Sequence, residues 1–161
     1  MHVVAFNGSP RKNGNTARLV RHCLDTLESE GISTEMVQVG GTNIRGCCSC
    51  LSCRKKAVEV CAITSDPFNE WIEKMKNAEG IILASPVYMF GTTPEMKALI
   101  DRASFIARGR VRRGEQGSMF YRKVGGAISA VRRAGAIQTL QTMISMFAVT
   151  QMVVPMSNYW T

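Results

Sequence analysis

The stretch "HVVAFNGSPRKNGNT" (residues 2–16) decides the fold of this chain. Residues 2–6 form a short, mostly apolar run typical of a buried strand, and a turn-rich loop from Asn7 to Asn15 follows. Apolar side chains then recur with the spacing of a helix face at Val20, Cys23, Leu24 and Leu27. A strand, a polar glycine loop and an amphipathic helix in this order predict the first unit of a parallel α/β sheet.

The same alternation continues along the chain. Further strands are predicted at residues 33–39, 80–85, 124–131 and 152–156. Three helical stripes lie between them: Phe68, Trp71, Ile72 and Met75; Met96, Leu99, Ile100 and Ala103; and Ile137, Leu140, Ile144 and Phe147. Apolar strands that alternate with helices predict an α/β fold, with a five-stranded parallel sheet covered by helices on both faces.

We expect one domain over residues 1–161, because no linker, repeat or low-complexity tract divides the sequence. A cysteine-rich segment at about residues 46–62 is interpreted as a loop insertion in that domain. Doubly wound folds usually continue from the fifth strand into a covering helix, whereas this sequence ends in "MSNYWT". The final covering helix is therefore predicted to be absent, and "SNYW" is expected to pack against the sheet.

Composition and charge narrow the classes of function. Apolar residues make up 45% and charged residues 20% of the chain, as in ordinary soluble domains. No apolar run approaches the roughly 20 residues that cross a bilayer, and the first residues lack the features of a signal peptide. We therefore expect a cytoplasmic protein without a membrane partner, in which structural disulfides are rare. The net charge of +8 includes the loop pairs Arg11–Lys12 and Arg132–Arg133, which an anionic cofactor explains at least as well as nucleic acid does. No nucleic-acid partner is expected.

The loop "NGSPRKNGNT" (7–16) carries the residues of an anion site. The hydroxyls of Ser9 and Thr16, the amide of Asn15 and the start of the helix converge on one point, and Arg11 adds a fork suited to phosphate oxygens. The loop matches neither a Walker A motif nor the G-x-G-x-x-G of dinucleotide sites. A polar turn with a Ser or Asn cap remains the alternative.

Two further strand ends carry loops of the same kind. "SPVYMFGTTPEMKALIDR" (85–102) offers the aromatic faces of Tyr88 and Phe90 beside a glycine, and "SAVRRAGA" (129–136) combines charge with glycine. Because the carboxyl ends of parallel strands share one edge of the sheet, the three loops are expected to form one site. That site suits a planar, phosphorylated heterocycle.

With these motifs the chain, from Val3 to about Val154, resembles the NAD(P)H-dependent FMN reductase superfamily and is most similar to its iron–sulfur flavoproteins. The resemblance implies a flavodoxin-like three-layer sandwich with strand order 2-1-3-4-5, and FMN as cofactor. It implies contacts to the FMN phosphate from Ser9, Arg11, Lys12, Asn15 and Thr16. It implies contacts to the isoalloxazine and ribityl from Pro86, Val87, Tyr88, Phe90 and Gly91, and at the ring edge from Arg132 and Gly135.

The segment "GCCSCLSCRKKAVEVC" (46–61) holds five of the six cysteines. Cys47, Cys50 and Cys53 follow the C-x₂-C-x₂-C spacing that begins a bacterial ferredoxin motif. Cys61 comes after seven further residues, whereas a ferredoxin ligand would come after three, but this fits the looser spacing of iron–sulfur flavoproteins. These four are the predicted ligands of a 4Fe–4S cluster, with zinc and free or redox-active thiols as alternatives. Cys48 is interpreted as a small spare side chain and Cys23 as core.

The leading functional hypothesis is an FMN-dependent oxidoreductase in which a cluster and flavin exchange electrons with a small redox protein, such as a ferredoxin, or a small-molecule acceptor. The alternatives are a metal-free reductase of FMN, quinones or azo or nitro compounds, with NAD(P)H as a transient donor, and a flavin-binding redox sensor. The resemblance also implies a homo-dimer or tetramer with the flavin near a subunit interface. Asp101 and Arg102 are expected to form an ion pair at a helix surface or interface.

Overall fold

The computed structural model of the chain describes residues 1–156. The predicted "SNYW" packing falls at residues 157–160, outside the described residues. The strands are β1 (His2–Asn7), β2 (Ser33–Gln38), β3 (Gly80–Pro86) and β4 (Val124–Ala130). The helices are α1 (Asn15–Ser29), α2 (Ser52–Lys55), α3 (Phe68–Asn77), α4 (Pro94–Ala107), α5 (Gly109–Arg112) and α6 (Ala136–Val149).

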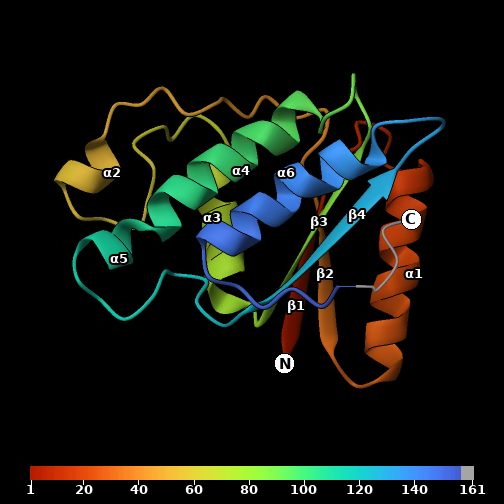
Figure 1. Cartoon of the computed structure of the whole chain (residues 1–161), viewed down its shortest axis with the longest axis horizontal. Helices are drawn as coiled ribbons and strands as arrows, with labels where there is room; N and C mark the ends of the chain where they lie inside the picture. Colours follow the sequence, from red (N-terminus) through yellow and green to blue (C-terminus); the bar gives the residue numbers. More distant parts are fainter. Residues whose placement is uncertain (157–161) are drawn as a thin grey trace.

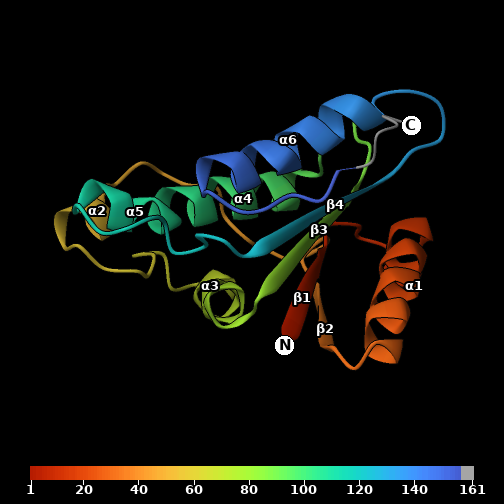
Figure 2. The same ribbon diagram turned by 60° about the horizontal axis from the view of Figure 1, so that its bottom comes forward.

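The strands of the described residues form one parallel sheet in the order β2-β1-β3-β4. Helix α1 covers one face of the sheet, and α3, α4 and α6 cover the other (Figures 1 and 2). This is the α/β three-layer arrangement that the sequence predicts, with helices on both faces. The strand order agrees with the first four places of the expected order.

The prediction of a full fifth strand at residues 152–156 is wrong. Only Val153 takes that place beside β4: it donates from its N–H to the carbonyl of Lys123 at 2.9 Å and accepts from the N–H of Gly125 at 2.8 Å. Pro155 follows two residues later and has no N–H to continue the ladder. The fifth strand is thereby reduced to a single parallel bridge in the described part of the chain.

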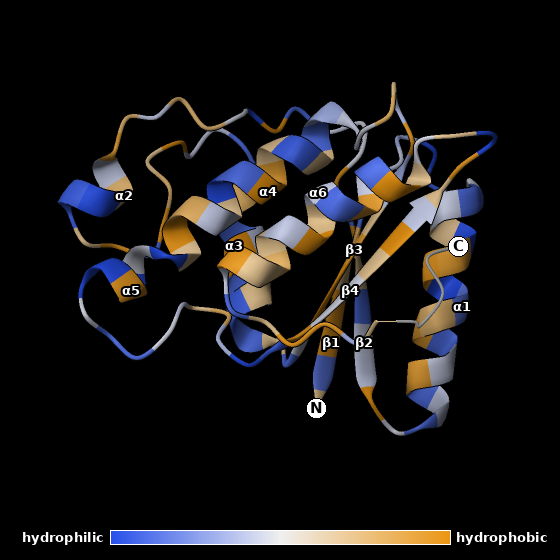
Figure 3. Cartoon of the chain, viewed as in Figure 1, coloured by the Kyte–Doolittle hydropathy of each residue, from blue (hydrophilic) through white to orange (hydrophobic). Residues whose placement is uncertain are grey.

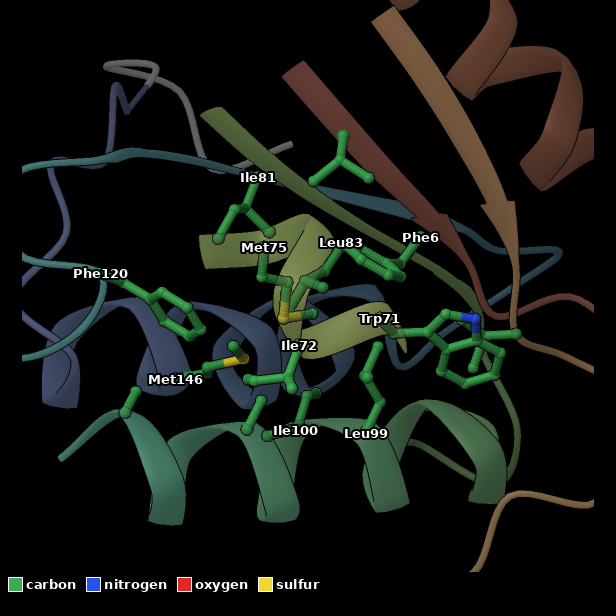
Figure 4. Packing of buried hydrophobic residues seen from close by; sticks show 14 of the residues in the cluster. Phe6, Trp71, Ile72, Met75, Ile81, Leu83, Leu99, Ile100, Phe120 and Met146 are labelled. Carbon is green, nitrogen blue, oxygen red and sulfur yellow. The ribbon is translucent and has the colours of Figure 1, made fainter. Parts of the chain in front are cut away.

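The larger hydrophobic core lies between the sheet and the three helices on one face. Phe6 and Leu83 from the sheet meet Trp71 and Ile72 of α3 and Leu99 of α4 (Figure 4). A smaller cluster between the sheet and α1 includes Ala5, Val20, Leu24, Ile82 and Ala84, with Cys23 packed against it. The predicted stripes of α3 and α4 are buried, and Cys23 contacts the core as predicted.

The predicted stripe of α6 is partly wrong. Phe147 is buried, but Ile137 is 45% exposed, and Leu140 and Ile144 are only half-buried. The residues that face the core are Thr139, Met143, Met146 and Phe147. Because α6 is apolar on more than one side, its periodicity did not select the buried face, and packing against β4 and α4 selected it instead.

The segment from residue 46 to residue 62 leaves the sheet and runs beside α4 to α2, which lies next to α5 (Figures 1 and 2). Apart from the single turn of α2 it has no regular secondary structure. No helix within residues 1–156 has both the length and the apolar character needed to cross a membrane.

Candidate functional site

The loops that follow β1, β3 and β4 lie together at the carboxyl edge of the sheet. The N–H of Gly8 donates to the carbonyl of Ala84 at 2.7 Å, and the N–H of Val87 donates to the carbonyl of Ala130 at 3.0 Å. These two bonds join the exits of neighbouring strands. The three strand ends singled out in the sequence therefore share one edge, which is where parallel sheets bind their ligands.

The first loop is held in shape by its own polar groups. The N–H of Ser9 donates to Oδ1 of Asn7 at 3.1 Å, and the hydroxyl of Ser9 accepts from the N–H of Arg11 at 3.2 Å. Nη2 of Arg21, on α1, donates to the carbonyl of Lys12 at 3.0 Å and to Oδ1 of Asn13 at 2.8 Å. Hydrogen bonds within the loop and from Arg21 of α1 therefore hold the loop next to the start of α1.

The first turn of α1 is suited to an anion. Its N-cap, Gly14, supplies no side-chain hydrogen bond, and the turn contains no acidic residue. Unsatisfied N–H groups at a helix start carry partial positive charge. Ser9 and Thr16 are buried beside them, whereas Arg11, Lys12 and Asn15 are exposed.

The loop after β3 forms a tight turn that presents aromatic side chains. Tyr88 and Gly91 exchange backbone hydrogen bonds of 2.8 and 3.0 Å, and the two residues between them, Met89 and Phe90, have positive φ angles. The side chains of Tyr88 and Phe90 are about half exposed at this edge. Pro86 ends β3, and Val87 begins the turn.

The loop after β4 packs against that turn. Gly135 has a φ of +96°, and a Cβ at this position would lie 2.8 Å from Cγ1 of Val87 and 3.0 Å from Cα of Phe90. Arg132 is exposed in the same loop. The hydroxyl of Ser129, the second-last residue of β4 before this loop, is buried and has no hydrogen-bond partner among the described residues. A polar group orphaned at this edge is consistent with a bound ligand that completes its hydrogen bonding.

Thr93 is a residue of this site that the sequence interpretation missed. Its hydroxyl donates to the carbonyl of Gly8 at 2.8 Å, and its N–H donates to the hydroxyl of Ser85 at 3.0 Å. It also caps α4 by accepting from the N–H of Met96. The signal for it was a threonine directly before the proline that opens a helix.

The cysteine segment forms a second site, at the other end of α4. Cys47, Cys48, Cys50, Cys53 and Cys61 line one cavity, together with Arg102, Phe105 and Ile106 of α4. All of these thiols are free. No group of three or more Cys, His, Asp or Glu side chains within residues 1–156 is arranged as the ligands of a metal ion.

The thiols of this cavity differ in their surroundings. A hydrogen bond from the backbone of Ser52 lowers the pKa of the Cys50 thiol. Burial raises the pKa of Cys53, and the neighbouring charges of Cys61 and Cys50 act in the same direction. Cys50, Cys53 and Cys61 all line this one cavity. Cys48, interpreted from the sequence as a spare side chain, faces the same cavity.

The expected surface ion pair of Asp101 and Arg102 is wrong. Asp101 pairs with Lys97 one turn earlier on α4, at 2.6 Å. Arg102 is 1% exposed and pairs with Asp66 at 2.6 Å. The Oδ1 of Asp66 also accepts from the N–H of Phe68, at the start of α3, at 3.2 Å. Successive residues of a helix point in different directions, so one meets solvent and the other the interior.

The end of the molecule around α2 and α5 is strongly basic. Arg54 and Arg112 line a cavity of about 190 Å³ together with Cys53, and α2 and α5 each carry hydrophilic residues (Figure 3). Lys55, Lys56 and Arg108 are exposed there. None of these five cations has an acidic partner within 4 Å among the described residues. This surface favours anionic partners.

Comparison with known proteins identifies the family. The sequence matches NADPH-dependent FMN reductase over residues 1–161. The chain belongs to this FMN reductase family. Its sequence is 36% identical over 160 residues to an iron–sulfur flavoprotein of Methanocaldococcus jannaschii, covering 98% of this chain and 77% of that protein. The resemblance predicted from the motifs is confirmed, and the chain is a member of a family of flavin-dependent oxidoreductases.

Solved structures agree on the fold. An archaeal flavodoxin superposes with a TM-score of 0.63 at 13% identity, covering 98% of this chain and 80% of the flavodoxin. RosB, solved with bound 8-demethyl-8-formylriboflavin-5'-phosphate, gives a TM-score of 0.66 at 19% identity, covering 96% of this chain. The chain spans 62% of the length of RosB. The flavodoxin-like fold of this FMN reductase family member is confirmed.

Proposed function

We propose that this chain binds FMN at the carboxyl edge of its sheet and works as a flavin-dependent oxidoreductase. The observation that carries the proposal is the meeting of three strand-end loops above the start of α1, with Gly135 packed on Val87 and Phe90. Bound FMN would supply hydride or single-electron transfer. The protein residues would position the flavin, place charge beside it and exclude water from it.

The proposed roles follow the geometry of the loops. Five residues at or next to the first turn of α1 would hold the phosphate: Ser9, Arg11, Lys12, Asn15 and Thr16. The loop after β3 would line the ribityl and isoalloxazine of FMN with Pro86, Val87, Tyr88, Phe90 and Gly91. The loop after β4 would place Arg132 and Gly135 at the edge of the ring. The unpartnered hydroxyl of Ser129 would bond to the same ligand.

We propose further that the cysteine segment binds a 4Fe–4S cluster through Cys47, Cys50, Cys53 and Cys61. Three features support this assignment: the spacing of the cysteines, the single cavity that they line, and the iron–sulfur flavoproteins among the relatives. A cluster in this place would supply one-electron transfer. Cys48 remains a fifth thiol on the same cavity.

The two proposed sites lie at opposite ends of α4. Pro94 opens the helix beside the flavin loops, and Phe105 lines the cysteine cavity near its end. At 1.5 Å per residue, the two positions are separated by roughly 16 Å along the helix axis. We therefore propose a homo-dimer or tetramer in which the cysteine segment of one chain lies near the flavin of another, so that electrons cross a subunit boundary.

The electron partner is proposed to be a small acidic redox protein such as a ferredoxin. The five cations around α2 and α5 that lack acidic partners lie at the same end of the molecule as the cysteine segment, and two of them, Arg54 and Arg112, line the cavity beside Cys53. Charge complementarity of this kind steers encounter and raises the association rate. A charge reversal of Arg54 and Lys55 is expected to slow electron transfer most at low salt.

A metal-free NAD(P)H-dependent reductase is the second candidate function. The exposure of Tyr88 and Phe90 favours it, because an uncovered flavin site would admit a nicotinamide or a small acceptor over the ring. Turnover with NAD(P)H in a preparation without iron would favour this candidate.

The experiment that tests the proposal is an anaerobic purification with quantitative flavin, iron and acid-labile sulfide analysis. Stoichiometric FMN with about four irons and four sulfides per chain is the expected result. FMN without iron or sulfide would leave the metal-free reductase and the flavin-binding redox sensor, which turnover with NAD(P)H then separates. A chain that does not bind added FMN would contradict the proposed function altogether.

A further inference from the structure

The two ends of the cysteine segment meet at one side chain, Arg102 of α4. Its Nη1 donates to the carbonyl of Arg45 at 3.1 Å, just before the segment begins, and its Nη2 donates to the carbonyl of Ile63 at 3.2 Å, just after it ends. Residues 46–62 therefore leave and return to the fold at a single guanidinium. Asn69 of α3 also holds the end of the segment: its Oδ1 accepts from the N–H of Cys61, and its Nδ2 donates to the carbonyl of Cys61.

The guanidinium itself is rigidly held. Oδ2 of Asp66 lies 2.6 Å from Nη1 of Arg102 and also accepts from the N–H of Arg45 at 3.0 Å. Asp66 therefore binds both the Arg102 side chain and the backbone of Arg45, to which Arg102 donates. The ring of Phe68 lies 4.0 Å below the guanidinium carbon. Both charged side chains are 1% exposed. A planar, bidentate fork can satisfy these contacts together, which the single ammonium of a lysine cannot.

One donor of Arg102 is left over. Its Nε is buried and has no hydrogen-bond partner among the described residues. Arg102 also lines the cavity that is lined by Cys47, Cys50, Cys53 and Cys61. A buried, charged N–H without an acceptor is costly, and such a group calls for an explanation. A sulfur atom bound in that cavity would be an acceptor for it.

We propose that Arg102 is a positioning residue of the cysteine segment, whose guanidinium closes the base of residues 46–62 and presents its Nε–H to a sulfur of the cluster bound there. The inference rests on the proposed function for the presence of the cluster, while the closure of the segment depends only on the protein. Hydrogen bonds to sulfur and nearby positive charge make a cluster easier to reduce.

The first test measures closure on the full chain without cluster. Backbone hydrogen exchange of residues 46–62 is compared in wild type, Arg102→Lys and Arg102→Met, with Lys97→Met as the matched control. That control breaks the exposed Lys97–Asp101 pair on the same helix and keeps the bonds from Arg102 to Arg45, Ile63 and Asp66. At least tenfold faster exchange in the segment is expected for both Arg102 variants, with β1 unchanged. Wild-type exchange in Arg102→Lys, which keeps a cation for Asp66, would overturn the closure.

The second test measures the reduction potential after reconstitution with iron and sulfide, by optical titration. A more negative potential is expected in Arg102→Lys, which lacks the Nε–H, and a larger shift in Arg102→Met, which also lacks the charge. A merely structural role would leave the potential of folded Arg102→Lys at the wild-type value, and that result would overturn the sulfur contact. A wild-type chain that takes up neither iron nor sulfide would contradict the proposed function and the sulfur contact together, while the exchange comparison would still decide the closure.

Discussion

Arg110 of α5 and Glu59 of the cysteine segment form a two-pronged ion pair, in which Nε of the arginine donates to Oε1 of the glutamate and Nη2 to Oε2. Lys76 of α3 lies 3.2 Å from the same carboxylate. The hydrogen bond from Arg110, supported by Lys76, lowers the pKa of Glu59 to about 2. Glu59 therefore ties residues 46–62 to two helices, independently of Arg102.

This ion pair predicts a pH dependence of stability. Because the pKa of Glu59 falls from 4.5 in the unfolded chain to about 2 when folded, its contribution is complete above about pH 4.5 and is lost as the pH falls through 2. Glu59→Gln is expected to cost about 1–3 kcal/mol at pH 7 and less at pH 3. Urea unfolding of both proteins at the two pH values measures the difference. Asp101→Asn, on an exposed pair of α4, is the control and is expected to cost less than about 0.5 kcal/mol.

Thr16 is predicted to bind the flavin phosphate through its buried hydroxyl. Thr16→Val keeps the shape of the side chain but removes the hydrogen bond to a charged group, so FMN affinity is expected to fall about 10- to 100-fold. Quenching of flavin fluorescence on titration measures the dissociation constant. Thr26→Val, near the far end of α1, is the matched control, because its hydroxyl bonds only within the helix. Equal affinity in Thr16→Val and wild type would contradict the placement of the phosphate.

Gly135 is predicted to be needed for the contact between two loops of the site. Gly135→Ala suffers both an unfavourable φ and the approach of Val87 and Phe90, whereas Gly31→Ala, at a φ of +77° with no atom within 4 Å, suffers only the first. We expect Gly31→Ala to cost about 1–2 kcal/mol, and Gly135→Ala to cost more. Thermal unfolding measures both costs. Only Gly135→Ala is expected to weaken FMN binding, and unchanged binding would show that the two loops do not form one flavin site.

Some of the cysteines are predicted to be ligands of the cluster, whereas Cys48 and Cys23 are predicted not to be. Cys50→Ser is expected to lose iron and sulfide while FMN binding persists, because the thiolate is the ligand and the flavin loops lie at the other end of α4. Cys48→Ser and Cys23→Ser are the controls and are expected to retain the cluster. Iron and sulfide analysis after anaerobic purification reports the outcome. Loss of the cluster in Cys48→Ser would mean that the fifth thiol, and not one of the four assigned, is a ligand.

The sequence predicted some parts of the fold well because they depend on local pattern. Strand β3 and helix α3 follow from one apolar run and one stripe, and both form as expected. The loops after β1, β3 and β4 were located correctly because parallel strands end at a common edge. The buried face of α6 was mispredicted, since an apolar helix offers several faces and only its neighbours select one.

The sequence by itself determined the alternation of strands and helices, the family, and the chemical inventory of two candidate sites, since these depend on residue type and spacing over short stretches of chain. Only the tertiary structure decided that Arg102 is buried on Asp66 and that it joins Arg45 to Ile63. These residues lie up to 57 positions apart in the chain. Such contacts exist only after helices and loops have packed, so no local pattern encodes them.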